Sequence, residues 1–319
     1  LTLPSAEESR NPKHNPKGLF NFRFEVGSCA NQNPLHGIGH RSPVYENLNQ
    51  DWADKTHFHI MNGDWLYEEL RTYPSEAWRL IQGQDALPPT VKTMPSIVGV
   101  WENYKLYLSR GNELAQWHRN VPSYFTFDDH ELVNDIWGSA EIGKRHRRTV
   151  FRDIGTRAWF DYLGWSNPSA PGAPDIVFGR GELRAGSDVL VDKSGRFADL
   201  DQSQITNLMV HWGGPSAGVN KRELDDVGGD PNAGPYTVVG RIDDQRLRIS
   251  PAARADSTSA YSIGRPSWSK MRVSNADFFF LDTRGQRDVY DLSKPDKPGV
   301  SMLGAKQKRW LKEQMQASD

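Results

Sequence analysis

The sequence has little of three things that would point to particular classes of protein. It contains a single cysteine, so no disulfide can form within the chain. Its 39 lysines and arginines face 40 aspartates and glutamates, and the lack of a basic surplus argues against general nucleic-acid binding. Its longest apolar runs, such as residues 278–281, fall far below the ~18 residues of a membrane helix, so we expect no transmembrane segment.

Two further absences concern the start of the chain. It begins with Leu1 and not with an initiator methionine, so we expect a processed or excised chain. No signal-peptide pattern is present, so the residues themselves do not indicate a compartment. With 319 residues and 11 tryptophans, the chain is predicted to fold as one large domain with an insertion or as two closely packed domains.

Alternating apolar residues predict four strands in the parts of the chain that read most regularly. We expect them at residues 21–26, 56–61, 123–127 and 277–281. Apolar residues at helical spacing predict helices at residues 97–108, 151–162 and 303–315. This alternation of strands and helices predicts an α/β fold in which a sheet is flanked by helices.

The composition divides the chain into three parts. Residues 1–18 are polar and are expected to lie over a surface as an extended arm. Residues 19–165 and 276–319 are predicted to form the core. Residues 166–275 are dense in proline and glycine and are predicted to form a β-rich insertion, with short strands at residues 188–191, 207–212, 236–242 and 246–249.

Polar residues that follow three of the predicted strands could form a metal site. Cys29 follows the first strand, Asp64 follows the second, and the run Asp128, Asp129 and His130 follows the third. Loops at the carboxyl ends of strands converge in open α/β sheets, so these side chains could meet. Several carboxylates in one place are costly unless a multivalent cation neutralises them.

Each of these residues also has a purely structural interpretation. Cys29 could be an inert buried thiol, and His130 could be a hydrogen-bonded structural histidine. Asp64 could cap a helix that starts at the next residue, and Asp128 with Glu131 matches a helix-capping pattern. Their joint placement at strand ends favours the metal site.

Ordered sequence blocks resemble the PhoD-like alkaline phosphatase/phosphodiesterase family of the metallophosphoesterase superfamily, which is related to purple acid phosphatases. The blocks are Gly-Ser-Cys-Ala at 27–30, Asn-Gly-Asp-Trp-Leu-Tyr-Glu at 62–68, Val-Pro-Ser-Tyr-Phe-Thr-Phe-Asp-Asp-His-Glu at 121–131, and residues 280–287 and 303–311. The resemblance spans about residues 20–318, with 166–275 matching poorly. It implies a metallophosphoesterase-like β-sheet sandwich flanked by helices.

The resemblance also implies a set of metal ligands. Asp64 would bridge two metals, Cys29 and Tyr67 would bind iron, and Asp129, assisted by Asp128, would bind the second metal. Thiolate and phenolate suit a transition metal, whereas carboxylates suit calcium. The implied cofactors are therefore iron (Fe³⁺) and calcium, or another dinuclear divalent metal pair.

The implied reaction is hydrolysis of a phosphate ester by a metal-activated water. His130 would stabilise the phosphoryl group or protonate the leaving group. Arg284 and Arg287 could clamp phosphoryl oxygens, since a guanidinium group matches phosphate with two hydrogen bonds. Alternatively, both arginines form surface salt bridges with one of the nearby aspartates, Asp282, Asp288 and Asp291.

The family implies a small-molecule or lipid-type phosphate ester as substrate and a periplasmic or secreted location. The basic run at residues 144–148 could hold an anionic substrate or form a solvated helix face. No Gly-Asp-x-His block of the superfamily follows Arg284, so we expect a fragment whose core is incomplete at the C-terminus. Two alternatives stay open: a catalytically inactive or truncated metallophosphoesterase-fold binding module, and a hydrolase of another ester.

Overall fold

The computed structural model describes most of the chain outside the first ten residues. The described residues are 11–13, 15–35, 39–70, 75–83, 85–138, 142–143, 149–168, 175–211, 231–289, 293–294 and 296–318. The basic run at residues 144–148, Asp291 and much of the predicted N-terminal arm lie outside them.

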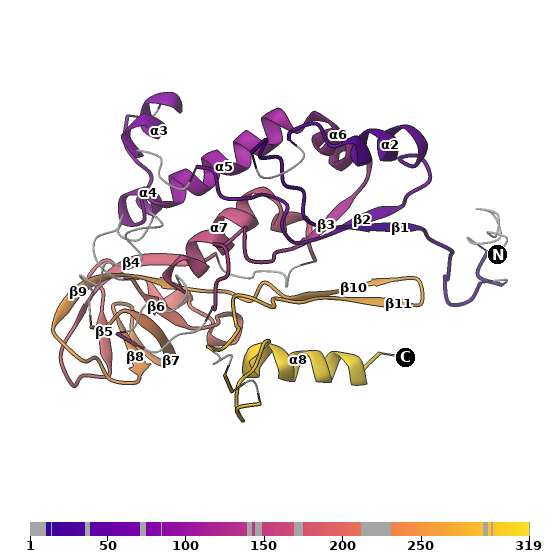
Figure 1. Cartoon of the computed structure of the whole chain (residues 1–319). Coiled ribbons are helices and arrows are strands. Elements are labelled where there is room, and N and C mark those ends of the chain that lie inside the picture. The colour runs from indigo at the N-terminus through magenta and orange to yellow at the C-terminus, as the bar shows by residue number, and fades with distance from the viewer. Residues whose placement is uncertain are drawn as a thin grey trace.

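A three-stranded parallel sheet forms the centre of the core (Figure 1). Its strands lie in the order β1-β2-β3, and they are β1 (Phe24–Gly27), β2 (Phe58–Asn62) and β3 (Ser123–Thr126). A hairpin of β10 (Ser269–Val273) and β11 (Ala276–Phe280) lies against one face of this sheet. The predicted α/β class and the four predicted strands are confirmed, with boundaries that differ by at most three residues.

Helices cover the outer faces of these two β layers (Figure 1). Over the parallel sheet lie α2 (Pro43–Asp51), α5 (Ile97–Arg110), α6 (Asn112–Asn120) and α7 (Arg152–Tyr162). Below the hairpin lies α8 (Gly304–Gln316), whose Trp310 packs edge-on against Phe279. The remaining short helices are α3 (Ser75–Ile81), α4 (Pro89–Thr93), η1 (Thr149–Phe151), η2 (Gly164–Ser166), η3 (Phe197–Asp199) and η4 (Gln202–Gln204).

Alternation along the strands explains this layering. Successive side chains of a strand point to opposite faces of the sheet. Phe58 and Tyr124 pack with the aromatic side chains of the hairpin, whereas Met61 and Phe125 belong to the core beneath the helices. Both faces of β2 and β3 are therefore covered, and the acidic residues that follow these strands lie at the carboxyl edge of the sheet.

The described residues between 177 and 263 form a closed six-stranded barrel with its own apolar core (Figure 1). Its strand order is β4-β5-β8-β7-β6-β9. The strands are β4 (Val177–Leu183), β5 (Val189–Val191), β6 (Leu208–Val210), β7 (Gly234–Asp243), β8 (Arg246–Ser250) and β9 (Ser257–Ile263). The sequence anticipated β5 to β8, but it missed β4, β9 and β10. Among the described residues, no helix combines the length and apolar character needed to cross a membrane.

The helix that Asp64 would cap in the alternative interpretation does not form. The segment after Asp64 is irregular, because its backbone groups bond to distant side chains instead of to each other. Asn103 of α5 accepts hydrogen bonds from the backbone N–H groups of Glu69 and Leu70, at 2.7 and 3.0 Å, and donates to the carbonyl of Tyr67 at 3.1 Å. These tertiary bonds replace the helical ones, so the capping interpretation of Asp64 is wrong.

Candidate metal centre

The carboxyl ends of the three parallel strands bring the acidic residues together. Asp64 lies two residues after β2, and Asp129 and His130 lie just beyond β3. One potential ligand atom from each of these three side chains lies within 4.8 Å of the other two. The loop that follows the neighbouring strand β1 reaches the same edge, since the backbone N–H of Cys29 donates to the carbonyl of Gly63 at 3.2 Å. This edge of the sheet therefore offers a cluster able to hold a metal ion.

Asp64 is buried, and its carboxylate faces Cys29 and Tyr67. Its Oδ2 accepts from the Tyr67 hydroxyl at 3.2 Å and lies 3.5 Å from Cys29 Sγ. Its Oδ1 is buried and has no hydrogen-bond partner among the described residues. Burial raises the pKa of Asp64, and the charges of Asp128 and Asp129 raise it further, although His130 opposes them. An unsatisfied buried carboxylate oxygen is costly, and a cation would satisfy it.

Backbone strain is concentrated at the same place. Cys29, Asp64 and Asp135 have φ angles of 59°, 56° and 58°, which non-glycine residues seldom adopt. Asp135 uses this conformation to donate its backbone N–H to Asp129 Oδ2 at 2.6 Å. Strain of this kind clusters at functional sites, where surrounding structure holds it in place. Cys29 is exposed, so its interpretation as an inert buried thiol is wrong.

Gly63 allows the second and third strand ends to approach closely. A Cβ atom at Gly63 would lie 2.5 Å from the backbone nitrogen of Asp128. Its φ of 82° also favours glycine. Only glycine therefore lets Asp64 and the Asp128–Asp129 pair share one site.

Arg284 reaches the acidic cluster from the turn that follows β11. Its Nε and Nη2 donate to the two carboxylate oxygens of Asp128, at 2.5 and 3.0 Å, and its Nη1 lies 3.8 Å from Asp129 Oδ2. Within the described part of the chain its side-chain ion partners are therefore in the cluster, and the surface salt-bridge alternative is wrong there. Asp282 instead accepts the backbone N–H of Arg284 at 3.0 Å.

Other predicted residues lie less centrally. The carboxylate of Asp128 is engaged by Arg284, and it is not part of the group of potential ligands formed by Asp64, Asp129 and His130. Arg287 is half-buried, and its backbone N–H donates to the carbonyl of Arg284 at 3.2 Å. The assigned roles of both residues stay predictions.

Sequence reasoning missed the partner of His130, which is Glu68. Glu68 Oε2 lies 2.6 Å from His130 Nδ1, and Glu68 Oε1 accepts the backbone N–H of Asn134. Burial lowers the pKa of His130, but the hydrogen bond and charge of Glu68 outweigh it, so the net shift is upward. The imidazole also packs on Tyr67, with ring centroids 3.9 Å apart. The only sequence signal for Glu68 was its place in the same block as Asp64 and Tyr67.

Glu131 links the loops that follow β2 and β3 through hydrogen bonds from its buried carboxylate. Its Oε1 accepts the backbone N–H of Trp65 at 2.6 Å, and its Oε2 accepts that of Asp128 at 3.1 Å. The second bond is the one expected of a capping pattern, but no helix follows. Complete burial, with the charge of Asp64, raises the pKa of Glu131 to about 8. Its role is to position the loops that carry the cluster.

A neutral histidine supports the cluster from within the core. The indole N–H of Trp65 donates to His118 Nε2 at 3.0 Å, so His118 Nδ1 carries the proton toward Ser123 Oγ, 2.8 Å away. Ser123 in turn donates to the carbonyl of Val121 at 2.9 Å. Burial, and then the nearby His59, lower the pKa of His118 to about 3.

Acid should therefore destabilise the metal-free protein through its buried histidines. Burial also lowers the pKa of His211 to about 4. Below pH ~6.5 the unfolded chain takes up protons that the folded chain refuses, so each histidine should remove about 1.4 kcal/mol of unfolding free energy per pH unit. Urea titrations of chelated protein between pH 6 and 4.5 should give, for His118→Gln, a pH slope of the unfolding free energy that is smaller by about 1.4 kcal/mol per pH unit. The exposed His40→Gln should match the unchanged protein, and an unaltered slope in His118→Gln would contradict this account.

Together these features define a class: a mixed α/β protein with an acidic cluster, able to hold a metal ion, at the carboxyl edge of a parallel sheet. The sequence model of the PhoD-like phosphatase family matches residues 24–183, half of the chain. The chain therefore belongs to the PhoD-like phosphatase family, whose matched segment carries every candidate site residue except Arg284 and Arg287.

The chain was also compared with solved structures and with curated proteins. A solved structure, described as the structure of PhoD, is similar over 93% of this chain, with 15% sequence identity and a TM-score of 0.46. The chain spans 39% of the length of that protein. No curated protein matches the chain at a significant level.

Proposed function

We propose that this chain carries a metal-dependent centre that hydrolyses phosphate esters. The observation that carries the proposal is the buried Oδ1 of Asp64, which lacks a hydrogen-bond partner among the described residues, in a carboxylate that clusters with Asp129 and His130. Membership of a phosphatase family supports the same reaction. The preferred substrate is a small-molecule or lipid-type phosphate ester, and we propose a periplasmic or secreted location on the habit of the family alone.

The donor set fits two different cations. Cys29 Sγ and the Tyr67 hydroxyl both lie within hydrogen-bonding distance of Asp64 Oδ2, and thiolate with phenolate suits iron (Fe³⁺). The carboxylate of Asp129 on the other side suits calcium or another divalent ion. Burial, and then the charge of Asp64, raise the pKa of Tyr67, so its phenol is protonated in the metal-free protein. Metal binding should therefore release protons.

Side chains around the centre supply the other elements of catalysis. A bound cation would supply the positive charge that polarises a phosphoryl oxygen and makes water more acidic. Glu68 accepts the Nδ1–H of His130 and favours the protonated imidazole, whose other N–H, on Nε2, can be donated to the departing oxygen of the ester. Arg284 presents a guanidinium group that can turn from Asp128 to a phosphoryl oxygen.

Elemental analysis and hydrolysis assays test the proposal together. Protein purified without chelators should contain about one iron and one further divalent ion per chain, and it should hydrolyse p-nitrophenyl phosphate or bis-p-nitrophenyl phosphate. Chelation should abolish both properties. Stoichiometric metal without hydrolysis would favour the binding-module alternative, and protein that hydrolyses the esters equally well without metal would refute the proposal.

Cys29→Ser should weaken iron binding selectively. The substitution replaces a thiolate by a hydroxyl of similar size, and an alcohol is a much poorer ligand for a transition metal. Iron content should fall by at least about half, with the second metal little changed, as measured by elemental analysis. Ser28→Ala, at the neighbouring position, is the matched control. Unchanged iron in Cys29→Ser would remove the thiol from the ligand set.

A further inference from the structure

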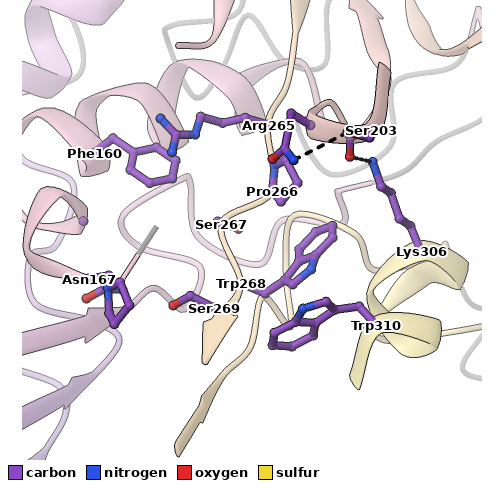
Figure 2. Close-up of a pocket in the computed structure, with 13 residues that line it drawn as sticks. Phe160, Asn167, Ser203, Arg265, Pro266, Ser267, Trp268, Ser269, Lys306 and Trp310 are labelled. Atoms are coloured by element: carbon purple, nitrogen blue, oxygen red, sulfur yellow. Dashed lines mark hydrogen bonds between the residues drawn. The ribbon is translucent and has the colours of Figure 1, made fainter. Parts of the chain in front are cut away.

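A cavity separate from the acidic cluster lies where α7, the segment before β10 and α8 meet (Figure 2). Its volume is about 250 Å³. Phe160 of α7 and Trp310 of α8 line it, and residues 265–269 run along one side. The cavity thus lies between segments that are far apart in the sequence.

The charge of this cavity is opposite to that of the metal centre. Arg265 and Lys306 both line it, and none of its lining residues in the described part of the chain is acidic. Burial lowers the pKa of Arg265, although a guanidinium group stays charged. The carboxylate that acts on Arg265 electrostatically, Asp175, is largely exposed and lies 3.5 Å from Arg157. The cavity therefore favours an anion.

Two polar atoms in the cavity lack hydrogen-bond partners. Arg265 Nε and Ser269 Oγ are both buried, and neither has a partner among the described residues. The guanidinium group of Arg265 lies over the ring of Phe160, 4.1 Å from the ring centroid. This contact fixes the plane of the guanidinium group and therefore the direction of its N–H groups. Buried donors without acceptors are costly, so an acceptor from a ligand would stabilise both.

Lys306 is held in place by the protein itself. Its Nζ donates to the carbonyls of Ser203 and Ile205, both at 2.6 Å (Figure 2 shows the first of these residues beside it). An ammonium group has three donors, so these two bonds leave a third. Lys306 therefore contributes a fixed positive charge to the cavity wall.

Two tryptophans give the cavity a flat apolar side. The indoles of Trp268 and Trp310 both line the cavity (Figure 2), and Trp268 is only 9% exposed. Trp310 is further fixed by its edge-on contact with Phe279. Aromatic side chains of this kind recognise the face of a ring, while the charged groups recognise an anion.

We propose that this cavity binds a small organic anion in which one phosphate-type group is attached to a single flat ring. The anion would accept hydrogen bonds from Arg265 and Ser269, and the ring would lie against the two indoles. A volume of about 250 Å³ suits a single ring with one anionic group. The proposal does not depend on the proposed phosphatase activity.

The cavity also shares a turn with the metal centre. Ser267, which lines the cavity, donates to Asp282 Oδ2 at 3.1 Å. The other oxygen of Asp282 accepts the backbone N–H of Arg284, the residue that binds Asp128. A ligand in the cavity would therefore lie next to the turn that presents Arg284.

Calorimetric titration of the chelated whole chain with phenylphosphonate tests the proposal. This probe carries the ring and the anion but has no ester bond to hydrolyse. We expect one site with a Kd below about 1 mM. Arg265→Gln and Ser269→Ala should weaken binding, the first by at least about tenfold, and Arg265→Lys should lie between. Arg246→Gln, at an exposed arginine on the barrel, is the matched control and should bind normally.

Further titrations test whether both the anionic group and the ring of the probe are needed, and whether binding occurs at this cavity and not at the metal centre. Inorganic phosphate should bind at least about fivefold more weakly than phenylphosphonate, and phenol should not bind measurably. Asp64→Asn should leave binding unchanged, because that residue belongs to the other site. No binding of phenylphosphonate up to 10 mM would overturn the proposal, as would equal binding by Arg265→Gln with unchanged circular dichroism or equal binding of inorganic phosphate. If Arg265→Gln does not fold, Trp310→Phe takes its place in the comparison.

Discussion

Asp64→Asn is expected to lose bound metal and to lower the rate of phosphate-ester hydrolysis by about a thousandfold. If Asp64 holds the proposed cation, its loss would remove the positive charge that stabilises the transition state by several kcal/mol, and an amide is a much poorer cation ligand. The fold should persist, because the buried Asp64 adds negative charge beside Asp128 and Asp129 in the metal-free protein. The metal-free variant should therefore be at least as stable as the unchanged chain.

Elemental analysis, turnover of p-nitrophenyl phosphate and urea unfolding measure these three effects separately. Asp54→Asn is the matched control, since Asp54 is an exposed aspartate after α2 with no part in the cluster. It should keep its metal and its turnover. Full activity in Asp64→Asn would rule out a ligand role for Asp64, and loss of metal together with marked unfolding would show a structural role instead.

Gly138→Ala is expected to destabilise the protein by about 3 kcal/mol and to displace Arg284 from Asp128. An added Cβ would lie 1.9 Å from the carbonyl oxygen of Gly285 and 2.5 Å from that of Arg284, so the turn that carries the arginine must move. Overpacking against backbone typically costs about 1–3 kcal/mol, and here no flexible side chain can give way. Removal of the arginine would leave Asp128 and Asp129 without their ion partner.

Urea unfolding of the metal-free protein should give the stability change. Gly240→Ala provides the control, since a Cβ there meets no atom within 4 Å. It should change the unfolding free energy by less than about 1 kcal/mol. A Gly138→Ala protein as stable as this control would mean that the turn at residues 284–285 is not packed against Gly138 in solution.

The central part of the site could be predicted because it follows from local sequence and one rule of topology. Alternation identified the strands that end before Cys29, Asp64 and Asp128, and parallel strands place their carboxyl ends at one edge. No knowledge of distant contacts was needed. Helices α5, α7 and α8 could be predicted for the same reason, from apolar residues repeated at helical spacing.

What could not be predicted depends on residues far apart in the chain. The pairing of Arg284 with Asp128 joins positions 156 residues apart, and nothing in either segment indicates the other. The irregular segment after Asp64 depends on Asn103 and Glu131, which override its helical pattern. The barrel closes through β4 and β9, whose alternation is weak because glycine and serine occupy many of their positions.

The first and last strands of the barrel are neighbours, so the segment that forms the barrel could be exchanged as a unit. Val177 at the start of β4 lies directly opposite Ile263 at the end of β9, so the chain leaves the core and returns to it at one place. Because closure entropy changes slowly with loop length, a homologue could carry a shorter or longer segment there at little thermodynamic cost. The constraints would be the contacts with the core, which include the hydrogen bond from Ser262 to Asp153 of α7, at 2.5 Å, the bonds of Lys306 to Ser203 and Ile205, and the burial of Met209 and Ala260 in the core of the helices. The barrel can therefore diversify in evolution while the acidic edge of the sheet stays as it is.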